Sequence, residues 1–282
     1  MHVPVLRKEV LECLNPKANE NFIDCTFGLG GHSSDILEKI RPTGKILGIE
    51  ADNELYQEVK KGVRKGIELV NDSYVNLENI VAQRKFKNVS GVLFDLGLSS
   101  WHLEISGRGF TFKKKEPLDM RYSKLNQTTA EKILNYWSKF EIERILREGM
   151  SEVAKAEKIA KVIVETRKNM PIKTTTQLLR IIDLLGGSPQ LTFQALRIAV
   201  NQELENLKKA LPQALNVLNS SGRLTVISFH SLEDRIVKNF FRQEAVSGKV
   251  EILTKKPVSP SAQEVRNNPR SRSAKLRCCQ KL

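Results

Sequence analysis

The stretch D-C-T-F-G-L-G-G-H-S, from Asp24 to Ser33, places three glycines between an apolar run and a segment with helical spacing. A strand, a glycine-rich turn and a helix in this order are typical of the first unit of a nucleotide-binding α/β sheet. Ser33 stands where the dinucleotide-binding pattern G-x-G-x-x-G has its third glycine. The pattern for a pyrophosphate is therefore incomplete, and the turn has to be interpreted together with its neighbours.

Strands and helices are predicted to alternate on both sides of this turn. Alternation of this kind indicates a parallel sheet. A short amphipathic helix is expected within residues 3–14. The expected strands lie at 22–26, 45–50, 67–72, 91–97 and 223–229, with two edge strands at 250–255 and 274–279, and the expected helices at 33–40, about 54–65 and 77–82.

The pattern changes after residue 97. Residues 98–122 form an irregular segment that is too long for an ordinary turn and is therefore a candidate functional loop. Consecutive helices follow over 128–185, and one long helix over 193–218, with a break near Pro212, returns the chain to the sheet. We therefore predict a discontinuous α/β domain of residues 1–104 and 192–282, interrupted by a helical domain of residues 105–191.

The composition favours a polyanionic partner. Lys and Arg outnumber Asp and Glu by 46 to 32, a net charge of +14, and residues 266–282 carry six of these cations and no acid. A merely basic, solvated surface is the alternative. No apolar run approaches the ~20 residues that span a bilayer, and the four cysteines form no C-x-x-C pair. These features predict a soluble cytoplasmic protein without a membrane segment or a bound metal.

Two carboxylates follow predicted strands. Glu50 closes the second strand, 22 residues after Gly28, where a carboxylate can accept hydrogen bonds from two ribose hydroxyls. Asp95 closes the fourth strand, where it would repel a pyrophosphate, and His32 brings a ring to the helix start. Together these residues favour S-adenosylmethionine over NAD. The alternative is that Asp24 and His32 only cap the turn.

Several longer strings resemble one known family over the whole chain. They are H-V-P-V-L (2–6), D-C-T-F-G-L-G-G-H-S (24–33), D-L-G-L-S-S (95–100), R-G-F-T-F (108–112), P-L-D-M-R (117–121), T-F-Q-A-L-R-I-A-V-N-x-E-L (192–204), V-I-S-F-H-S-L-E-D-R-I-V-K (226–238) and N-P-R-S-R-S-A-K-L-R (268–277). On these strings the chain resembles the RsmH (MraW) family.

The resemblance implies a fold and an activity. The fold would be that of a class I S-adenosylmethionine-dependent methyltransferase, a Rossmann-like, seven-stranded, mostly parallel sheet with an inserted all-α domain. The activity would be N(4)-methylation of a cytidine in the decoding centre of 16S ribosomal RNA, in an assembled or partly assembled small subunit. The oligomeric state stays open, a homodimer included.

The resemblance also assigns roles to single residues. Cofactor contacts would fall on Gly30, Gly31, His32, Glu50, Tyr74, Asp95 and His102. The chemistry and position of the residues, rather than the resemblance, give the candidate substrate contacts; Arg108 and Phe112 combine a cation and an aromatic ring beside the lysines at 113–115, as recognition of a single-stranded base requires. These candidates are Ser99, Arg108, Phe112, His230, Arg270 and Arg272. Asp95 is the candidate catalytic residue, with backbone carbonyls of residues 96–99, because acceptors for the amino hydrogens of cytosine would let its nitrogen attack the methyl group. The alternative is that Asp95 only positions the cofactor.

A serine, a histidine and an aspartate lie near the end of the predicted fifth strand. Ser228, His230 and Asp234 are too close in sequence to form a hydrolase triad, and Asp234 could simply brace a helix. In the R-G-F-T-F string, Phe110 is expected to be a buried loop anchor, whereas Phe112 is left open between an anchor and a base contact.

The chain departs from the family pattern in the helical insertion. It has M-S-E-V-A-K-A-E-K-I-A at 150–160 and Leu191 where arginines are usual, and Trp101 and His102 where Pro-Gln is usual. A non-catalytic or retargeted RNA- or ribosome-assembly-binding protein is therefore the alternative function.

Overall fold

The computed structural model describes residues 4–149 and 153–282 and divides into two compact units. Unit 1 comprises Met1–Gly97 and Leu204–Leu282, and unit 2 comprises Leu98–Glu203. The sequence had placed these borders at 104/105 and 191/192. Residues 2 and 3 of the H-V-P-V-L string and residues 150–152 of the divergent insertion string lie outside the described residues.

Unit 1 is built on a sheet of seven strands among the described residues, in the order β3-β2-β1-β4-β5-β7-β6. β1 to β5 are mutually parallel, and β7 runs antiparallel to both β5 and β6. The strand order reverses between β1 and β4, the position at which open α/β sheets bind ligands. The strands are β1 (Asn21–Asp24), β2 (Ile46–Glu50), β3 (Ile67–Asn71), β4 (Val89–Asp95), β5 (Leu218–Ser228), β6 (Val250–Ile252) and β7 (Lys275–Lys281).

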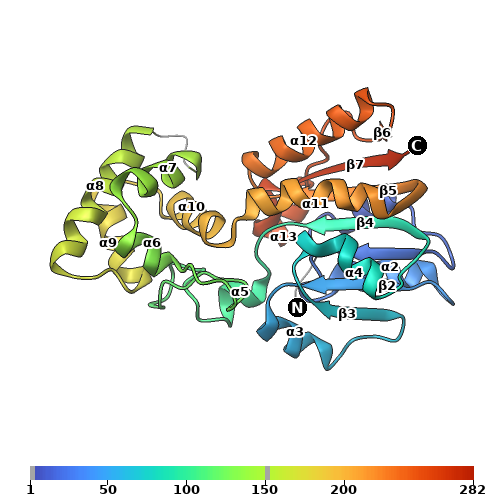
Figure 1. The fold of residues 1–282 in the computed structure, drawn as a ribbon, viewed down its shortest axis with the longest axis horizontal. Coiled ribbons are helices and arrows are strands. Elements are labelled where there is room, and N and C mark those ends of the chain that lie inside the picture. Colours follow the sequence, from blue (N-terminus) through green and yellow to red (C-terminus); the bar gives the residue numbers. More distant parts are fainter. Residues whose placement is uncertain (1–3, 150–152) are drawn as a thin grey trace. The chain divides into compact units, whose positions relative to one another are not determined.

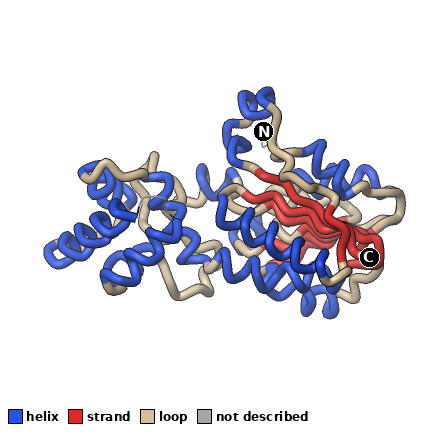
Figure 2. Tube along the Cα trace, turned by 90° about the horizontal axis from the view of Figure 1, so that it is seen from above, coloured by secondary structure: helices blue, strands red, loops and turns tan. Residues whose placement is uncertain are grey.

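Helices cover both faces of this sheet (Figure 2). Successive strand residues point to opposite faces, so Phe22 packs with apolar residues of α1 and α2, whereas Ile23 packs with those of α4, α11 and α12. The helical elements of this unit are α1 (Arg7–Leu14), α2 (Gly31–Ile40), α3 (Asn53–Lys60), η1 (Tyr74–Asn76), α4 (Leu77–Gln83), α11 (Glu203–Val217), α12 (Ser231–Val246), α13 (Ala262–Asn267) and η2 (Pro269–Ser273).

Unit 2 is helical around its own apolar core (Figure 1). Glycine allows close packing there, because a Cβ atom on Gly149 would lie 2.5 Å from that of Ala195. The helices of this unit are α5 (Ser100–Glu104), α6 (Ala130–Tyr136), α7 (Lys139–Gly149), α8 (Val153–Asn169), α9 (Thr175–Leu184) and α10 (Pro189–Asn201). The prediction of a helical insertion after the fourth strand is confirmed.

The predicted helix over 193–218 is wrong in where it breaks. Gln202 adopts a left-handed conformation with φ of 51°, and its N–H caps α10 by donating to the carbonyl of Ile198. Pro212 lies inside α11 without ending it. The sequence also missed α5, α13 and η2, which are short elements with weak apolar periodicity.

Candidate active site

The turn after β1 needs its glycines for backbone shape and for packing. Gly28 and Gly30 have φ of 53° and 73°, a region that favours glycine. A Cβ atom on Gly30 would lie 2.7 Å from the Phe27 ring, and one on Gly31 would overlap the ring of Pro4. The turn is therefore held closed by its own neighbours before any ligand binds.

Asp24 and Ser33 fasten the two ends of this turn to each other. The Ser33 hydroxyl donates to Asp24 Oδ2 at 2.7 Å, and the Thr26 N–H donates to Asp24 Oδ1 at 3.1 Å. Burial raises the pKa of Asp24, against the opposing effect of the Ser33 hydroxyl. Asp24 therefore caps the turn. A serine in place of the third glycine supplies this hydroxyl.

Glu50 connects the end of β2 to the same turn. Its carboxylate accepts the Gly28 N–H at 3.0 Å and the Asp52 N–H at 2.8 Å. Burial raises the pKa of Glu50 to about 7. Each carboxylate oxygen has a second lone pair, so two ribose hydroxyls can still donate to this side chain.

Asp95 and His32 face each other between β4 and α2. The Asp95 N–H donates to Thr26 Oγ1 at 2.6 Å, which fixes the end of β4 beside the turn. Asp95 Oδ2 lies 3.6 Å from His32 Nε2, too far for a hydrogen bond. Burial lowers the pKa of His32, but the carboxylates of Asp95, Asp24 and Asp35 outweigh it and raise this pKa.

Two atoms of this pair are buried without a hydrogen-bond partner among the described residues. They are Asp95 Oδ1 and His32 Nε2. A native structure rarely leaves such atoms unsatisfied, and a bound ligand is one reason for it. An acceptor and a ring nitrogen beside a glycine turn and the Glu50 carboxylate would fit S-adenosylmethionine, whose amino acid and ribose carry hydrogen-bond donors.

Tyr74 lies at the corresponding end of β3. It opens η1, and its ring meets the Phe94 ring edge-on at 5.5 Å. Six of the seven predicted cofactor residues therefore lie at or just after the carboxyl ends of neighbouring strands of unit 1. These residues are Gly30, Gly31, His32, Glu50, Tyr74 and Asp95.

The residues after β5 have separate structural partners. His230 caps α12, its Nδ1 accepting the Glu233 N–H at 3.4 Å, and Asp234 forms a two-bond ion pair with Arg277, the closer contact 2.6 Å. The Ser228 hydroxyl donates to the Lys275 carbonyl at 3.3 Å. The exclusion of a hydrolase triad is confirmed, and so is the bracing role of Asp234. A substrate role for His230 stays a prediction.

The remaining predicted cofactor residue, His102, lies in unit 2. Ser99 Oγ and His102 form a capping box at α5, in which Ser99 Oγ lies 2.9 Å from His102 Nδ1. The His102 ring is buried and meets the rings of Phe110 and Tyr122 at 5.2 and 5.1 Å. Ligand contacts by Ser99 and His102 stay predictions.

Arg108 is buried in the loop that the sequence marked as irregular. Its guanidinium donates to the carbonyls of Arg121 and Tyr122 and lies 5.4 Å from the Trp101 ring centroid. Phe110 is buried and stacks on Tyr122 at 5.5 Å, so its role as an anchor is confirmed. RNA contacts by Arg108 stay a prediction.

Phe112, the second aromatic residue of this loop, is only partly buried. Its ring meets that of Phe193 edge-on at 5.5 Å. A base contact through its exposed part stays a prediction.

Sequence reasoning missed the polar contacts that hold this loop. Asn201 donates to the Met120 carbonyl at 2.7 Å and accepts the Tyr122 N–H at 2.8 Å. Glu203 accepts from Arg197 at 2.8 Å and from the Tyr122 hydroxyl at 3.2 Å. The polar residues Asn201 and Glu203, at the end of an apolar helix, were the feature of the sequence that could have indicated these contacts. The bond from Asn201 to Met120 therefore joins the P-L-D-M-R string (117–121) to the string that begins at residue 192.

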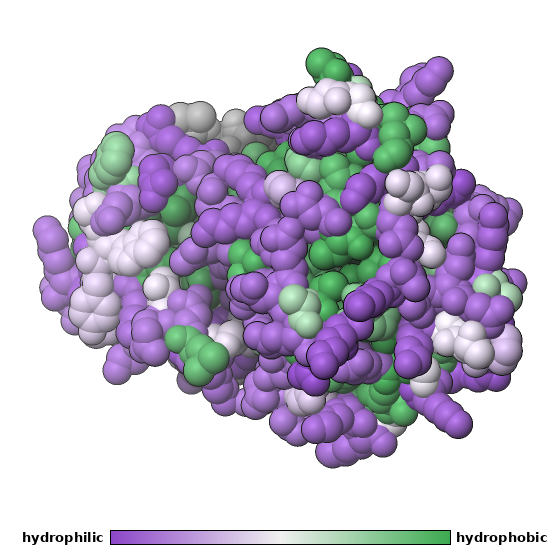
Figure 3. All heavy atoms as spheres, turned by 45° about the vertical axis from the view of Figure 1, so that its right-hand side comes forward, coloured by the Kyte–Doolittle hydropathy of each residue, from purple (hydrophilic) through white to green (hydrophobic). Residues whose placement is uncertain are grey.

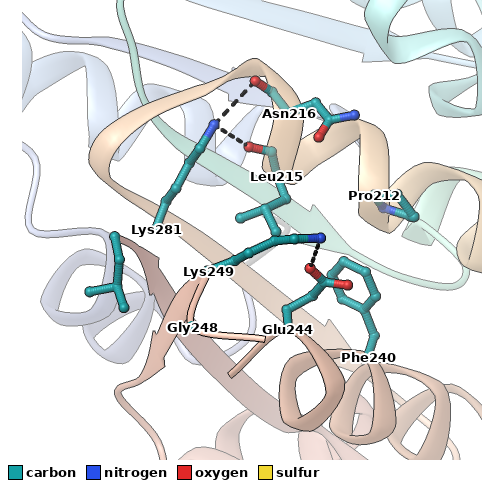
Figure 4. Close-up of a pocket in the computed structure, with 9 residues that line it drawn as sticks. Pro212, Leu215, Asn216, Phe240, Glu244, Gly248, Lys249 and Lys281 are labelled. Carbon is teal, nitrogen blue, oxygen red and sulfur yellow. Dashed lines mark hydrogen bonds and ion pairs between the residues drawn. The ribbon is translucent and has the colours of Figure 1, made fainter. Parts of the chain in front are cut away.

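A separate hollow of about 340 Å³ lies beside α11, α12 and the end of β7 (Figure 4). Lys281 donates to the carbonyl of Leu215, in the last turn of α11, at 2.9 Å and to that of Leu218, the first residue of β5, at 2.7 Å. Lys249 pairs with Glu244 at 2.8 Å. Both lysines that line this hollow are thus engaged. The hollow lies at the amino ends of the parallel strands, away from the predicted cofactor residues.

A parallel sheet with one antiparallel strand at β7, a glycine turn after β1 and acids ending β2 and β4 define a class I S-adenosylmethionine-dependent methyltransferase fold. The whole chain, residues 1–282, matches the sequence model of the MraW methylase family, and the chain belongs to that family. It is accordingly an enzyme of the methyltransferase class that uses S-adenosylmethionine.

Relatives align end to end with the chain. A Halothermothrix orenii protein called ribosomal RNA small subunit methyltransferase H is 43% identical over 100% of this chain and 98% of its own length. Proteins of the same name from Dictyoglomus thermophilum and Thermotoga neapolitana are 44% and 43% identical, covering 98% and 99% of this chain and 95% of each relative.

A solved structure shares the fold. The Streptococcus mutans protein SMU.1697c, solved in complex with SAH, gives a TM-score of 0.50 at 11% identity, covering 100% of both chains. At this identity the likeness concerns the fold alone. Within the described residues, no helix combines the length and the apolarity that crossing a membrane requires.

Proposed function

We propose that this protein transfers a methyl group from S-adenosylmethionine to the exocyclic N(4) of a cytidine in the decoding centre of 16S ribosomal RNA. The observation that carries this proposal is the end-to-end alignment, at 43% identity, with a protein called ribosomal RNA small subunit methyltransferase H. The net charge of +14 agrees with a polyanionic substrate.

The cofactor roles follow from the strand ends of unit 1. Glu50 accepts hydrogen bonds from the ribose hydroxyls, and the turn with Gly30 and Gly31 holds the amino acid end. His32, Tyr74 and His102 complete the cofactor contacts. When bound, the cofactor supplies a methyl group activated by a cationic sulfur.

Asp95 has the chemistry to prepare the attacking nitrogen. The lone pair of an aromatic amine is delocalised into its ring, so an acceptor for the amino hydrogens favours the attacking geometry. Asp95 Oδ1 is a buried acceptor without a partner among the described residues. Methyl transfer leaves a surplus proton on the nitrogen, which the Asp95 carboxylate accepts.

Residues that follow β4, follow β5 or precede β7 bind the RNA. These are Ser99, Arg108 and Phe112 from unit 2, which serves as the substrate-recognition domain, and His230, Arg270 and Arg272 from unit 1. The target cytidine must leave its stack to reach the methyl group. The substrate is therefore an assembled or partly assembled small subunit, in the cytoplasm, that presents this cytidine.

Small subunits from cells that lack the enzyme provide the test. They are incubated with the protein and S-adenosylmethionine, and their digested rRNA is analysed by nucleoside mass spectrometry. N(4)-methylcytidine at one position in the decoding centre is the expected product. Binding of S-adenosylmethionine in calorimetry without any methylcytidine would overturn the proposal and favour a non-catalytic RNA-binding protein.

A further inference from the structure

A cluster of cations lies on the segment that joins β6 to β7. This β6–β7 connector, residues 253–274, carries a single acid, Glu264, whose carboxylate accepts the Leu6 N–H at 2.7 Å. Its five cations have exposed side chains. They are Lys255, Lys256, Arg266, Arg270 and Arg272.

Hydrogen bonds fix the backbone of the connector. Val258 exchanges two backbone hydrogen bonds with Leu276 of β7, at 2.9 and 2.8 Å. Ser261 caps α13, and Ser271 of η2 is fully buried. Because the backbone is already ordered, its cations can meet a ligand at a smaller cost in conformational entropy than those of a flexible tail.

The connector ends at the carboxyl edge of the sheet, meaning the side formed by the carboxyl ends of the parallel strands, where the predicted cofactor residues lie. β7 begins at Lys275, which pairs with Ser228, the last residue of β5. The carboxyl ends of β1, β2 and β4, with Asp24, Glu50 and Asp95, lie along this same edge. The bond from Leu6 to Glu264 also joins the connector to the start of α1.

We propose that the β6–β7 connector is a docking surface for the phosphate backbone of an RNA strand that enters the active edge. This inference rests on the proposed function. The connector contains no Phe, Tyr or Trp on which a base could stack, so its contacts position the strand without reading its sequence. Figure 3 shows that hydrophilic side chains cover much of one molecular face, so the connector is distinguished by its excess of cations over acids and not by polarity alone.

A matched pair of variants separates the connector from general surface charge. The connector variant is Lys255→Gln/Lys256→Gln. The control is Lys17→Gln/Lys87→Gln, which removes the same charge from two exposed lysines just before β1 and β4, at the opposite edge of the sheet. Calorimetry with S-adenosylmethionine checks that both variants remain folded and bind cofactor like the parent.

Binding to a transcript of the decoding region is measured by fluorescence anisotropy over a series of salt concentrations. We expect the connector variant to bind about tenfold more weakly near ~0.1 M salt and to lower the slope of log K against log salt by about 1.5, because two phosphate contacts are lost. The control should stay within about twofold of the parent. Equal losses in both variants would overturn the proposal.

Failure of the docking proposal can be distinguished from failure of the methylation proposal. If the parent methylates small subunits but the connector variant keeps the parent's affinity and salt slope, the docking surface is wrong and the proposed function stands. If the connector variant alone loses affinity while no methylcytidine forms, phosphate docking stands and the enzymatic function fails.

Discussion

The carboxyl edge of the unit 1 sheet and the loop 98–122 of unit 2 both carry strings that predicted ligand contacts, yet their polar groups are used differently. At the sheet edge, Asp95 Oδ1 and His32 Nε2 are buried without hydrogen-bond partners among the described residues. In unit 2, Arg108 of the loop and Asn201 of α10 bond to main-chain groups of residues 120–122. The edge thus has polar groups available to a ligand, whereas the inner residues of the loop form a framework.

The largest expected effect is on catalysis, from Asp95→Asn. We expect kcat for small-subunit methylation to fall by about 10²–10³-fold, because the charged acceptor for the amino hydrogens is lost. The melting temperature should fall slightly, because the variant loses the negative charge that faces His32 Nε2, whereas Asp95 Oδ1 has no hydrogen bond to lose among the described residues. Single-turnover methylation and differential scanning fluorimetry measure the two quantities.

Asp72→Asn is the control for Asp95→Asn. Asp72 is another acid, just after β3, whose oxygen accepts from Ser73 and Asn76, contacts that asparagine can keep. It should methylate like the parent. If Asp95→Asn binds cofactor normally and also methylates at the parent rate, Asp95 only positions the cofactor and the contrast with the loop weakens.

The next effect is the pH dependence contributed by Glu50. Burial raises its pKa to about 7 from a value of 4.5, so the folded protein keeps a proton that the unfolded chain releases. Its contribution to stability is therefore complete below pH 4.5 and is lost as the pH rises through about 7, a loss of about 3 kcal/mol. Urea unfolding at pH 5 and pH 7.5 should show a larger loss of stability in the parent than in Glu50→Gln, and this difference measures Glu50, because the pKa values of Asp24 and His32 are raised as well.

Cofactor binding should have the opposite pH dependence, because ribose hydroxyls donate to the ionised carboxylate. Affinity for S-adenosylmethionine should rise between pH 5.5 and 7.5 in the parent, and this rise should disappear in Glu50→Gln. Asp24 also has a raised pKa, so only the difference between the two proteins isolates Glu50. Identical pH profiles would contradict the role assigned to Glu50.

The framework role of the loop is tested by Arg108→Met. This change leaves the carbonyls of Arg121 and Tyr122 without their charged donor, and we expect it to destabilise unit 2 by about 2 kcal/mol. Affinity for S-adenosylmethionine serves as the measure of an intact sheet edge. A variant with unchanged stability and weakened RNA binding would instead make Arg108 a substrate contact, as the cations and aromatic residues of the loop predicted.

Sequence patterns predicted the sheet better than the site. The positions of strands depend on local apolar periodicity, whereas the site depends on contacts between distant segments. The burial of successive strand residues on alternate faces follows from period and composition, so β1 to β5 could be located from apolar runs. The break at Gln202 could not be located, because a residue other than glycine in the left-handed region is not marked by the residue type. Pro212 suggested a break that does not occur. The engagement of Arg108 depends on contacts between distant segments, which no local string contains.

The smallest expected effect is on stability, from Gly31→Ala. This variant tests whether Gly31 is needed for binding the ligand or for packing at the carboxyl ends of the strands. A Cβ atom on Gly31 would overlap the Pro4 ring, so Gly31→Ala should destabilise unit 1 by about 1–2 kcal/mol. Pro4→Ala should restore part of this loss in the double variant, since the clash involves these two residues alone. Gly62→Ala, with nothing within 4 Å of its new Cβ atom, should be neutral or slightly stabilising. Thermal unfolding measures all four proteins. A Gly31→Ala protein with the parent's stability and weaker cofactor binding would show instead that the glycine is needed for the close approach of the ligand.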